Sequence, residues 1–283
     1  MATYDEYIEK RFNEHLEDFR KKFPNLELAY FAVQGSQNYG LDYYGDGYCS
    51  DLDTKAIVLP SLDDIVQNKS PISITYVREN NEHIDIKDIR VMFDTFKKQN
   101  VNFIEILFSK WKYINPMYEK FFNELIENRE EIAHFNYNQA LRCMAGMSFE
   151  KKKALCHPYP TIKDKIDKYG YDGKQLHHII RMNDFIKNYV IGFSYEKCLS
   201  TFSDKDLLFD AKLNRFSLDE ALKLAEQYDE DTKRIMQENL KEDEAINEKA
   251  LEILDNVKYN CIKRYIISQL IEEVKNGIKT EVF

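Results

Sequence analysis

The sequence predicts an α+β protein in which a mixed β-sheet core is followed by an all-helical C-terminal region. Up to about residue 112, short apolar runs of strand length alternate with turn residues. From residue 115 onward, apolar residues recur almost throughout at the helical spacing of three or four positions. A chain of 283 residues is long enough for two cores. We therefore expect one domain at residues 1–112 and a second, helical domain at 113–283.

The elements of the first region follow from where apolar runs begin and where turn residues stop them. Gly35 ends one apolar run and Pro60 ends another, and Ser61 is a typical helix N-cap. A loop with two glycines, 43–48, separates those runs. The predicted elements are helix 3–22, strands 26–33 and 52–59, helix 61–69, strands 73–79 and 82–89, and helical segments 89–100 and 101–108.

The second region is predicted as a series of helices with one acidic stretch. Residues 219–248 carry much of the acidic charge, which indicates a solvated helical face. The predicted helices are 117–133, 136–153, 172–190, 217–226, 229–254 and 257–276.

Composition excludes several classes of protein. The net charge of −9 and pI of about 5.3 argue against a broad cationic surface for nucleic acid, although a local basic groove stays open. The five cysteines are scattered without metal-site spacing, so neither a disulfide framework nor a zinc site is expected. Apolar stretches stay short of the roughly 18–20 residues that span a bilayer. The N-terminus lacks an apolar leader, so we expect a cytoplasmic protein without membrane contact.

Carboxylates in two predicted strands are the first candidate site. Side chains alternate along a strand, so Asp51 and Asp53 share a face while Leu52 points into the core. Asp85 lies at the centre of a later alternating strand, and its neighbours Glu82 and Asp88 are the alternatives for a third carboxylate. Asp46, in the loop before, competes with the first two. Converging carboxylates repel unless a cation lies between them, and their oxygens suit magnesium.

A Gly-Ser turn precedes these aspartates. Gly35 would let the backbone approach a phosphate closely, and Ser36 would add a hydroxyl. The N–H groups at the start of the next short helix would offer an anion site. Taken alone, each of these short patterns is weak, and a plain turn explains each equally well.

Cationic side chains recur along one face of the predicted helix 172–190. Lys174, His177 or His178, and Arg181 are spaced at about one turn each. Such a stripe can hold a triphosphate, and arginine gives paired hydrogen bonds to phosphate. A solvated stripe beside an apolar face is the alternative. For Lys55, a structural ion pair is favoured over a phosphate contact. An N-cap is favoured for Asn102, and a buried structural partnership for Glu105.

The order of these features resembles that of the DNA polymerase beta-type nucleotidyltransferase superfamily. Members carry a Gly-Ser turn, an Asp-x-Asp strand and a third acidic residue on a later strand, matched here by Gly35, Ser36, Asp51, Asp53 and Asp85. The chain is most similar to the predicted nucleotidyltransferases associated with RNA ligases, through GSQNYGL, SDLDTK, the 98–109 segment and the K-x-x-H-H-x-x-R helix. This likeness is strongest over residues 1–112 and extends to about 190.

The resemblance implies transfer of a nucleoside monophosphate from an NTP, expected to be ATP, to an acceptor hydroxyl. Asp51, Asp53 and Asp85 would hold two magnesium ions, which manganese could replace. Gly35, Ser36, Lys174, His178 and Arg181 would bind the nucleotide. An RNA end, tRNA-like, is the expected acceptor, with a protein or a small molecule such as an antibiotic as alternatives. A catalytically silent nucleotide-binding module is the remaining alternative.

Overall fold

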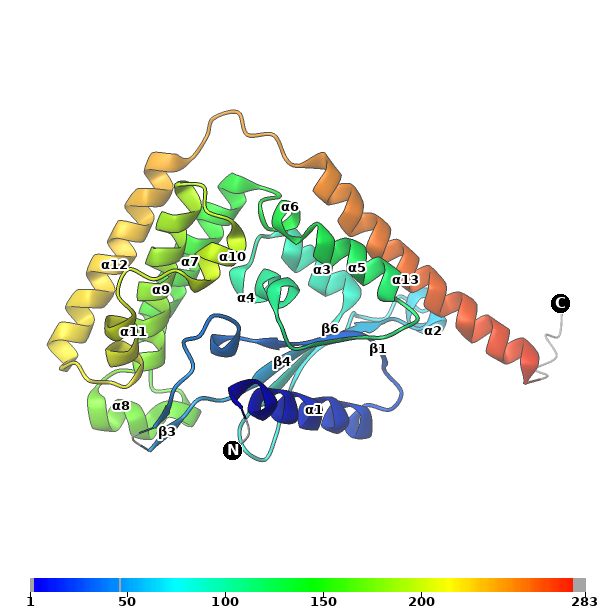
Figure 1. Ribbon diagram of the computed structural model, residues 1–283, viewed down its shortest axis with the longest axis horizontal. Coiled ribbons are helices and arrows are strands. Elements are labelled where there is room, and N and C mark those ends of the chain that lie inside the picture. Colours follow the sequence, from blue (N-terminus) through cyan, green and yellow to red (C-terminus); the bar gives the residue numbers. More distant parts are fainter. Residues whose placement is uncertain (1–2, 46, 277–283) are drawn as a thin grey trace.

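The computed structural model describes residues 3–45 and 47–276, so Asp46 lies outside the described residues. A five-stranded mixed sheet lies between one N-terminal helix and a larger group of helices (Figure 1). The predicted α+β class with a helical C-terminal region is confirmed. The domain boundary at residue 112 stays a prediction.

The strands form a sheet in the order β5-β6-β4-β1-β7. β4 pairs antiparallel with β1 and parallel with β6, while β5 and β7 are antiparallel edge strands. The five strands are β1 (Glu27–Gln34), β4 (Asp53–Leu59), β5 (Ser73–Val77), β6 (His83–Asp88) and β7 (Lys112–Ile114). The loop predicted at 43–48 instead contains a small hairpin of β2 (Tyr44–Gly45) and β3 (Tyr48–Cys49).

Alternation along β4 divides the sheet into two buried faces. Ala56 and Val58 belong to one core, which α1 covers, whereas Ile57 and Leu59 belong to the other core, beneath the C-terminal helices. Leu52 is fully buried in the core under α1, as the sequence predicts. By the same alternation Asp53 and Lys55 lie on the face of the C-terminal helices.

Several helices begin at a residue whose side chain caps the helix N-terminus. Thr3 caps α1, and the predicted N-cap Ser61 caps α2 with Asp64 completing a capping box. In the N-terminal half the helical elements are α1 (Tyr4–Lys22), η1 (Ser36–Asn38), α2 (Leu62–Val66), α3 (Ile89–Lys97), α4 (Val101–Ile104), η2 (Glu105–Phe108) and α5 (Glu119–Glu127). They are followed by α6 (Arg129–Ala133), α7 (Tyr137–Ala154), η3 (Pro160–Ile162), α8 (Lys163–Tyr169), α9 (Gly173–Val190), α10 (Tyr195–Ser200), α11 (Lys205–Lys212), α12 (Leu218–Asn239) and α13 (Glu248–Lys275).

Two predicted breaks between helices are wrong, because α12 runs through residues 227–228 and α13 runs through residues 255–256. The acidic stretch near residue 228 does not interrupt α12, because buried residues such as Ala221, Ala225 and Thr232 keep one face continuous. The break comes later, and Asn247 caps α13. Strand β7 and helices α8, α10 and α11 were not predicted, since each is short and has few periodic residues.

The last helix returns to the sheet. α13 packs against α3, α5 and β4 and then extends beyond them (Figure 1). Lys97 of α3 forms an ion pair with Asp255 at 2.7 Å, and the Leu62 N–H donates to the Gln269 side chain at 3.1 Å. The helices described in the structure include none that is long and apolar enough to cross a membrane.

Candidate active site

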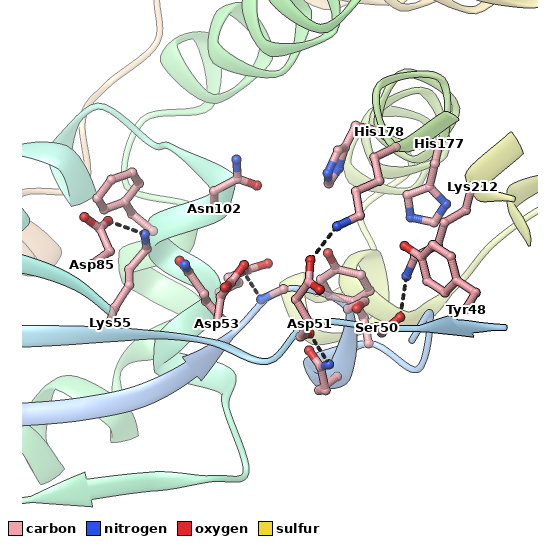
Figure 2. Close-up of a pocket in the computed structure, with 18 residues that line it drawn as sticks. Tyr48, Ser50, Asp51, Asp53, Lys55, Asp85, Asn102, His177, His178 and Lys212 are labelled. Atoms are coloured by element: carbon pink, nitrogen blue, oxygen red, sulfur yellow. Dashed lines mark hydrogen bonds and ion pairs between the residues drawn. The ribbon is translucent and has the colours of Figure 1, made fainter. Parts of the chain in front are cut away.

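A cavity of about 360 Å³ lies where β1 ends and β4 begins, on the side of the sheet that faces α9 (Figure 2). The antiparallel register places Gln34, the last residue of β1, opposite Asp53, the first residue of β4. The Gly-Ser turn and the aspartates therefore meet at one edge of the sheet. The predicted residues that line the cavity are Gly35, Ser36, Asp51, Asp53, Asp85, Lys174 and His178.

Asp51 and Asp53 each use one carboxylate oxygen to accept hydrogen bonds from other residues of the protein. Asp51 Oδ2 accepts a hydrogen bond from Lys174 Nζ at 2.6 Å. Asp53 Oδ1 accepts from the His83 backbone N–H at 2.8 Å and lies 3.2 Å from His83 Nδ1, and this bond raises the pKa of the His83 imidazole. The other oxygen of each carboxylate has no hydrogen-bond partner within residues 3–45 and 47–276. Both side chains thus keep acceptor capacity toward the cavity.

The backbone around these aspartates is held from both sides. Gln37 donates from Nε2 to the Asp51 carbonyl oxygen at 2.7 Å. The Leu52 N–H donates to Glu82 Oε1 at 3.2 Å. These two bonds hold the backbone from which both carboxylates project.

Asp85 lies in the same cavity but not beside Asp53. In the parallel pairing of β4 and β6, Asp85 is opposite Lys55, which is two residues or about 6.6 Å along the strand from Asp53. Lys55 Nζ contacts Asp85 Oδ2 at 2.8 Å, and Lys87 Nζ contacts its Oδ1 at 2.9 Å. Burial raises the pKa of Asp85, but these lysines outweigh burial and lower it overall. The expected direct convergence of three carboxylates is therefore replaced by two carboxylates and an adjacent lysine–aspartate pair.

The two alternatives for a third carboxylate lie outside the cavity. Glu82 is buried and forms ion pairs with Arg11, with His15 at 2.8 Å and with Arg78 at 2.8 Å. Burial raises its pKa, yet the hydrogen bonds from His15 and Arg11 bring it well below the usual range. Asp88 caps α3 and forms an ion pair with Arg90 at 2.7 Å. Glu82 and Asp88 therefore stabilise the fold through these contacts.

The Gly-Ser turn depends on glycine for its backbone. Gly35 has φ of +87°, a conformation that glycine adopts without strain, and a Cβ there would meet no atom within 4 Å. Its N–H donates to Glu105 Oε1 at 2.7 Å, so this N–H is not offered to a phosphate. The following η1 is a single 3₁₀ turn. The Gly35 N–H therefore does not contribute to the expected anion site, which stays a prediction for the N–H groups at the start of η1; Gly35 and Ser36 both line the cavity.

Glu105 is buried below this turn. Its second oxygen, Oε2, is buried with no partner in the described chain, and burial raises the pKa of its carboxyl. It therefore serves the structural partnership that the sequence suggests, while also lining the cavity. Asn102 lines the cavity as well, but the N-cap of α4 is Asn100, which corrects the expectation for Asn102.

The opposite wall is cationic and comes from the helical region. Lys174 is the second residue of α9, whose N-cap is Asp172. Lys212, at the end of α11, is buried and donates to the Leu41 carbonyl oxygen at 2.7 Å and to Ser50 Oγ at 3.1 Å. Burial and the nearby Lys174 charge lower the pKa of Lys212 to about 8. Sequence analysis did not identify Lys212 as a site residue. The sequence indicates only that Lys212 lies four residues after the apolar Leu208, and so on the same face of a helix.

The predicted cationic stripe on α9 divides into different environments. His177 Nδ1 lies 2.9 Å from the Leu208 carbonyl oxygen, and burial lowers its pKa to about 3. Burial also lowers the pKa of His178 well below its ordinary value, so both imidazoles are neutral. Arg181 does not line the cavity: it is buried, stacks 4.4 Å from the Tyr39 ring and donates to Asn102 Oδ1 at 3.3 Å. Nε and Nη1 of Arg181 have no partner in the described chain.

No protein-family model matches the chain, and no curated protein matches it.

The donor set fits magnesium that arrives with a phosphate ligand. The described residues contain no cluster of three or more His, Cys, Asp or Glu that could hold a metal by itself. Magnesium usually takes one or two carboxylates and completes its shell with water and substrate phosphates. Asp51 and Asp53 offer two carboxylates with uncommitted oxygens, beside a cationic wall that suits phosphates. An all-protein metal cage is not what this cavity offers.

Proposed function

We propose that this protein is a magnesium-dependent nucleotidyltransferase that moves a nucleoside monophosphate from an NTP to an acceptor hydroxyl and releases pyrophosphate. The observation that carries the proposal is the cavity itself. It joins two carboxylates with uncommitted oxygens, from the sheet, to lysines from α9 and α11. Separate segments of the chain supply the metal-binding and phosphate-binding chemistry that such a transfer needs.

Each residue has a defined task in this proposal. Asp51 and Asp53 hold magnesium, which when bound polarises the phosphates and stabilises the charge on the leaving pyrophosphate. Lys174 and Lys212 neutralise the triphosphate, and Ser36 donates its hydroxyl to a phosphate oxygen. Neutral His178 offers a donor or acceptor without adding charge. Arg181 supports the cavity from behind through Tyr39 and Asn102.

The transfer is a single substitution at phosphorus. The acceptor oxygen forms a bond to the α-phosphorus while the bond from that phosphorus to the bridging oxygen breaks, and pyrophosphate leaves with the electron pair. Asp85 accepts the hydroxyl proton, because the charges of Lys55 and Lys87 keep its carboxyl ionised at neutral pH. The lysine pair also limits the basicity of Asp85, so positioning and charge carry most of the catalysis.

The acceptor is proposed from resemblance alone. An RNA end is our first choice, with ATP as the nucleotide, because the RNA-ligase-associated nucleotidyltransferases share the motifs of this chain. A protein hydroxyl or a small antibiotic would use the same chemistry.

Label transfer tests the proposal directly. The protein is incubated with each α-labelled NTP and magnesium, together with total RNA, total protein or no acceptor. We expect label in one acceptor class, and a roughly thousandfold loss in the Asp51→Asn/Asp53→Asn variant, equivalent to several kcal/mol of transition-state stabilisation. The control variant Glu79→Gln/Asp94→Asn removes two exposed carboxylates elsewhere and should retain activity. Full label transfer by the Asp51→Asn/Asp53→Asn variant would disprove the assignment.

A nucleotide-binding module without catalysis is the second candidate. The lysine pairing of Asp85, which withdraws a third carboxylate from Asp53, favours it. Such a module would be stabilised by magnesium and NTP in a thermal unfolding experiment, yet would transfer no label to any acceptor.

A further inference from the structure

The ion pair between Lys174 and Asp51 crosses the cavity. Lys174 comes from the start of α9 and Asp51 from the residues just before β4, so the pair joins the two walls. Nζ and Oδ2 are 2.6 Å apart, and both side chains are 39% exposed. The contact therefore lies at an accessible position where a ligand can exchange with either partner.

Both members of this pair have a second use in the proposed function. Asp51 is a magnesium ligand there, and Lys174 is a phosphate ligand. Burial alone would lower the pKa of Lys174, but Tyr48, Asp51 and Asp53 raise it, so the amine is charged in the ligand-free protein. Lys174 occupies only Oδ2 of Asp51, so a metal can still reach Oδ1, but the two positive charges on one carboxylate repel and metal binding there is weakened.

We propose, on the basis of the proposed function, that Lys174 weakens metal binding at Asp51 until nucleotide arrives. Lys174 competes with metal for Asp51, so metal and nucleotide bind together rather than metal first. When a triphosphate enters, Lys174 exchanges the carboxylate for phosphate oxygens, and both oxygens of Asp51 then face the metal without a competing ammonium. Without nucleotide, releasing Asp51 would cost Lys174 its 2.6 Å ion pair while Lys212 stays nearby as a like charge.

The surrounding contacts favour this exchange over a fixed structural pair. Asp53 has a backbone N–H partner at 2.8 Å and stays in place when Lys174 moves. Gln37 and Glu82 hold the backbone of residues 51 and 52, so Asp51 needs only its side chain to change partner. Lys174 is the movable member, because four rotatable bonds connect its amine to α9.

Metal binding without nucleotide is the decisive measurement. Mn²⁺ replaces Mg²⁺ and is titrated into the full-length protein by electron paramagnetic resonance, first alone and then with a non-hydrolysable NTP analogue. We expect weak Mn²⁺ binding to the wild type alone and tight binding with nucleotide. In Lys174→Met, Mn²⁺ alone should bind about tenfold more tightly, and the mutual enhancement of metal and nucleotide should fall by a similar factor.

Three further variants isolate the effect. Lys187→Met is the matched control, since Lys187 lies on the same helix and pairs with Asp231 at 2.8 Å, away from the cavity. It removes the same charge and should leave Mn²⁺ affinity unchanged. Adding Asp51→Asn to Lys174→Met should abolish the gain. Lys174→Gln, which keeps a polar side chain, should reproduce the gain.

The outcomes separate this inference from the proposed function. If the wild type binds Mn²⁺ with nucleotide but the Lys174 variants bind Mn²⁺ alone no more tightly than wild type, the competition is disproved and the nucleotidyltransferase assignment stands. If the wild type binds no Mn²⁺ even with nucleotide, both are disproved. If Lys187→Met gains affinity equally, a general charge effect replaces the specific competition.

Discussion

The carboxylates at the start of β4 and those along β6 differ in how completely the protein satisfies them. Asp51 and Asp53 are half-buried and each keeps an oxygen without a partner in the described chain. Glu82 and Asp88 are buried and bound by arginines or a histidine. Asp85 is intermediate, since it lines the cavity but holds two lysines.

This difference identifies the carboxylates that can accept a ligand. A carboxylate whose oxygens are bound by fixed cations and N–H groups has its charge compensated, and its removal leaves buried charge behind. A carboxylate with an uncommitted oxygen beside a cavity can accept a new ligand. Sequence proximity does not distinguish these cases: Glu82, Asp85 and Asp88 lie three residues apart from one to the next.

The largest effect on stability is expected at Glu82. Glu82→Ala would leave Arg11, His15 and Arg78 without their shared anion in a buried site. The expected loss is about 3–5 kcal/mol of unfolding free energy, measured by urea denaturation. Exposed Glu79 is the control, and Glu79→Ala should stay within about 0.5 kcal/mol of wild type. A small loss at Glu82 would remove the distinction between the two groups of carboxylates.

Asp85 should respond in both activity and stability. Asp85→Asn is expected to lower transfer by roughly 100-fold through loss of the proton acceptor. It should also alter acid unfolding. The pKa of Asp85 in the folded state lies below its usual value of 3.8, so its ion pairs stabilise the fold above about pH 4 and are lost as pH falls through the lower value. Asp85→Asn should lack that part of the acid dependence. Normal activity in this variant would place Asp85 with Glu82 as purely structural.

Strand alternation explains how much of this site the sequence could predict. The alternation places Leu52 in the core and Asp53 on the opposite face, and the structure agrees. Gly35 was correctly expected to end a strand beside the aspartates. These predictions rest on local backbone geometry, which can be inferred from residues that are close together in the sequence.

Register and long-range partners could not be predicted in this way. Alternation fixes the face of Asp85 but not which residue of β4 it meets, and the register makes that residue Lys55. Lys212 reaches the cavity from a helix that lacks a strong pattern, more than 160 residues from its partner Ser50. Glu82 could be assigned to the fold only once Arg11, His15 and Arg78 were seen to surround it.

The smallest effect is expected at Glu105. It tests whether the hydrogen-bond partners of a carboxylate predict the role of that residue. Its Oε1 is committed to the Gly35 N–H at 2.7 Å and its Oε2 is not committed in the described chain, although the side chain is only 2% exposed. If its task is to hold the Gly-Ser turn, an acceptor at Oε1 is sufficient and the charge is not needed. Burial raises the pKa of this carboxyl, so the protein disfavours its charged form. Glu105→Gln should therefore bind nucleotide within about threefold of wild type, whereas Glu105→Leu should bind about tenfold more weakly, because the Gly35 N–H loses its partner. Calorimetric titration with an NTP analogue measures both, and the thermal midpoint of each variant shows whether the fold is retained. Equal losses in Gln and Leu would mean that the carboxylate contacts nucleotide itself, which would move Glu105 into the same group as Asp51 and Asp53.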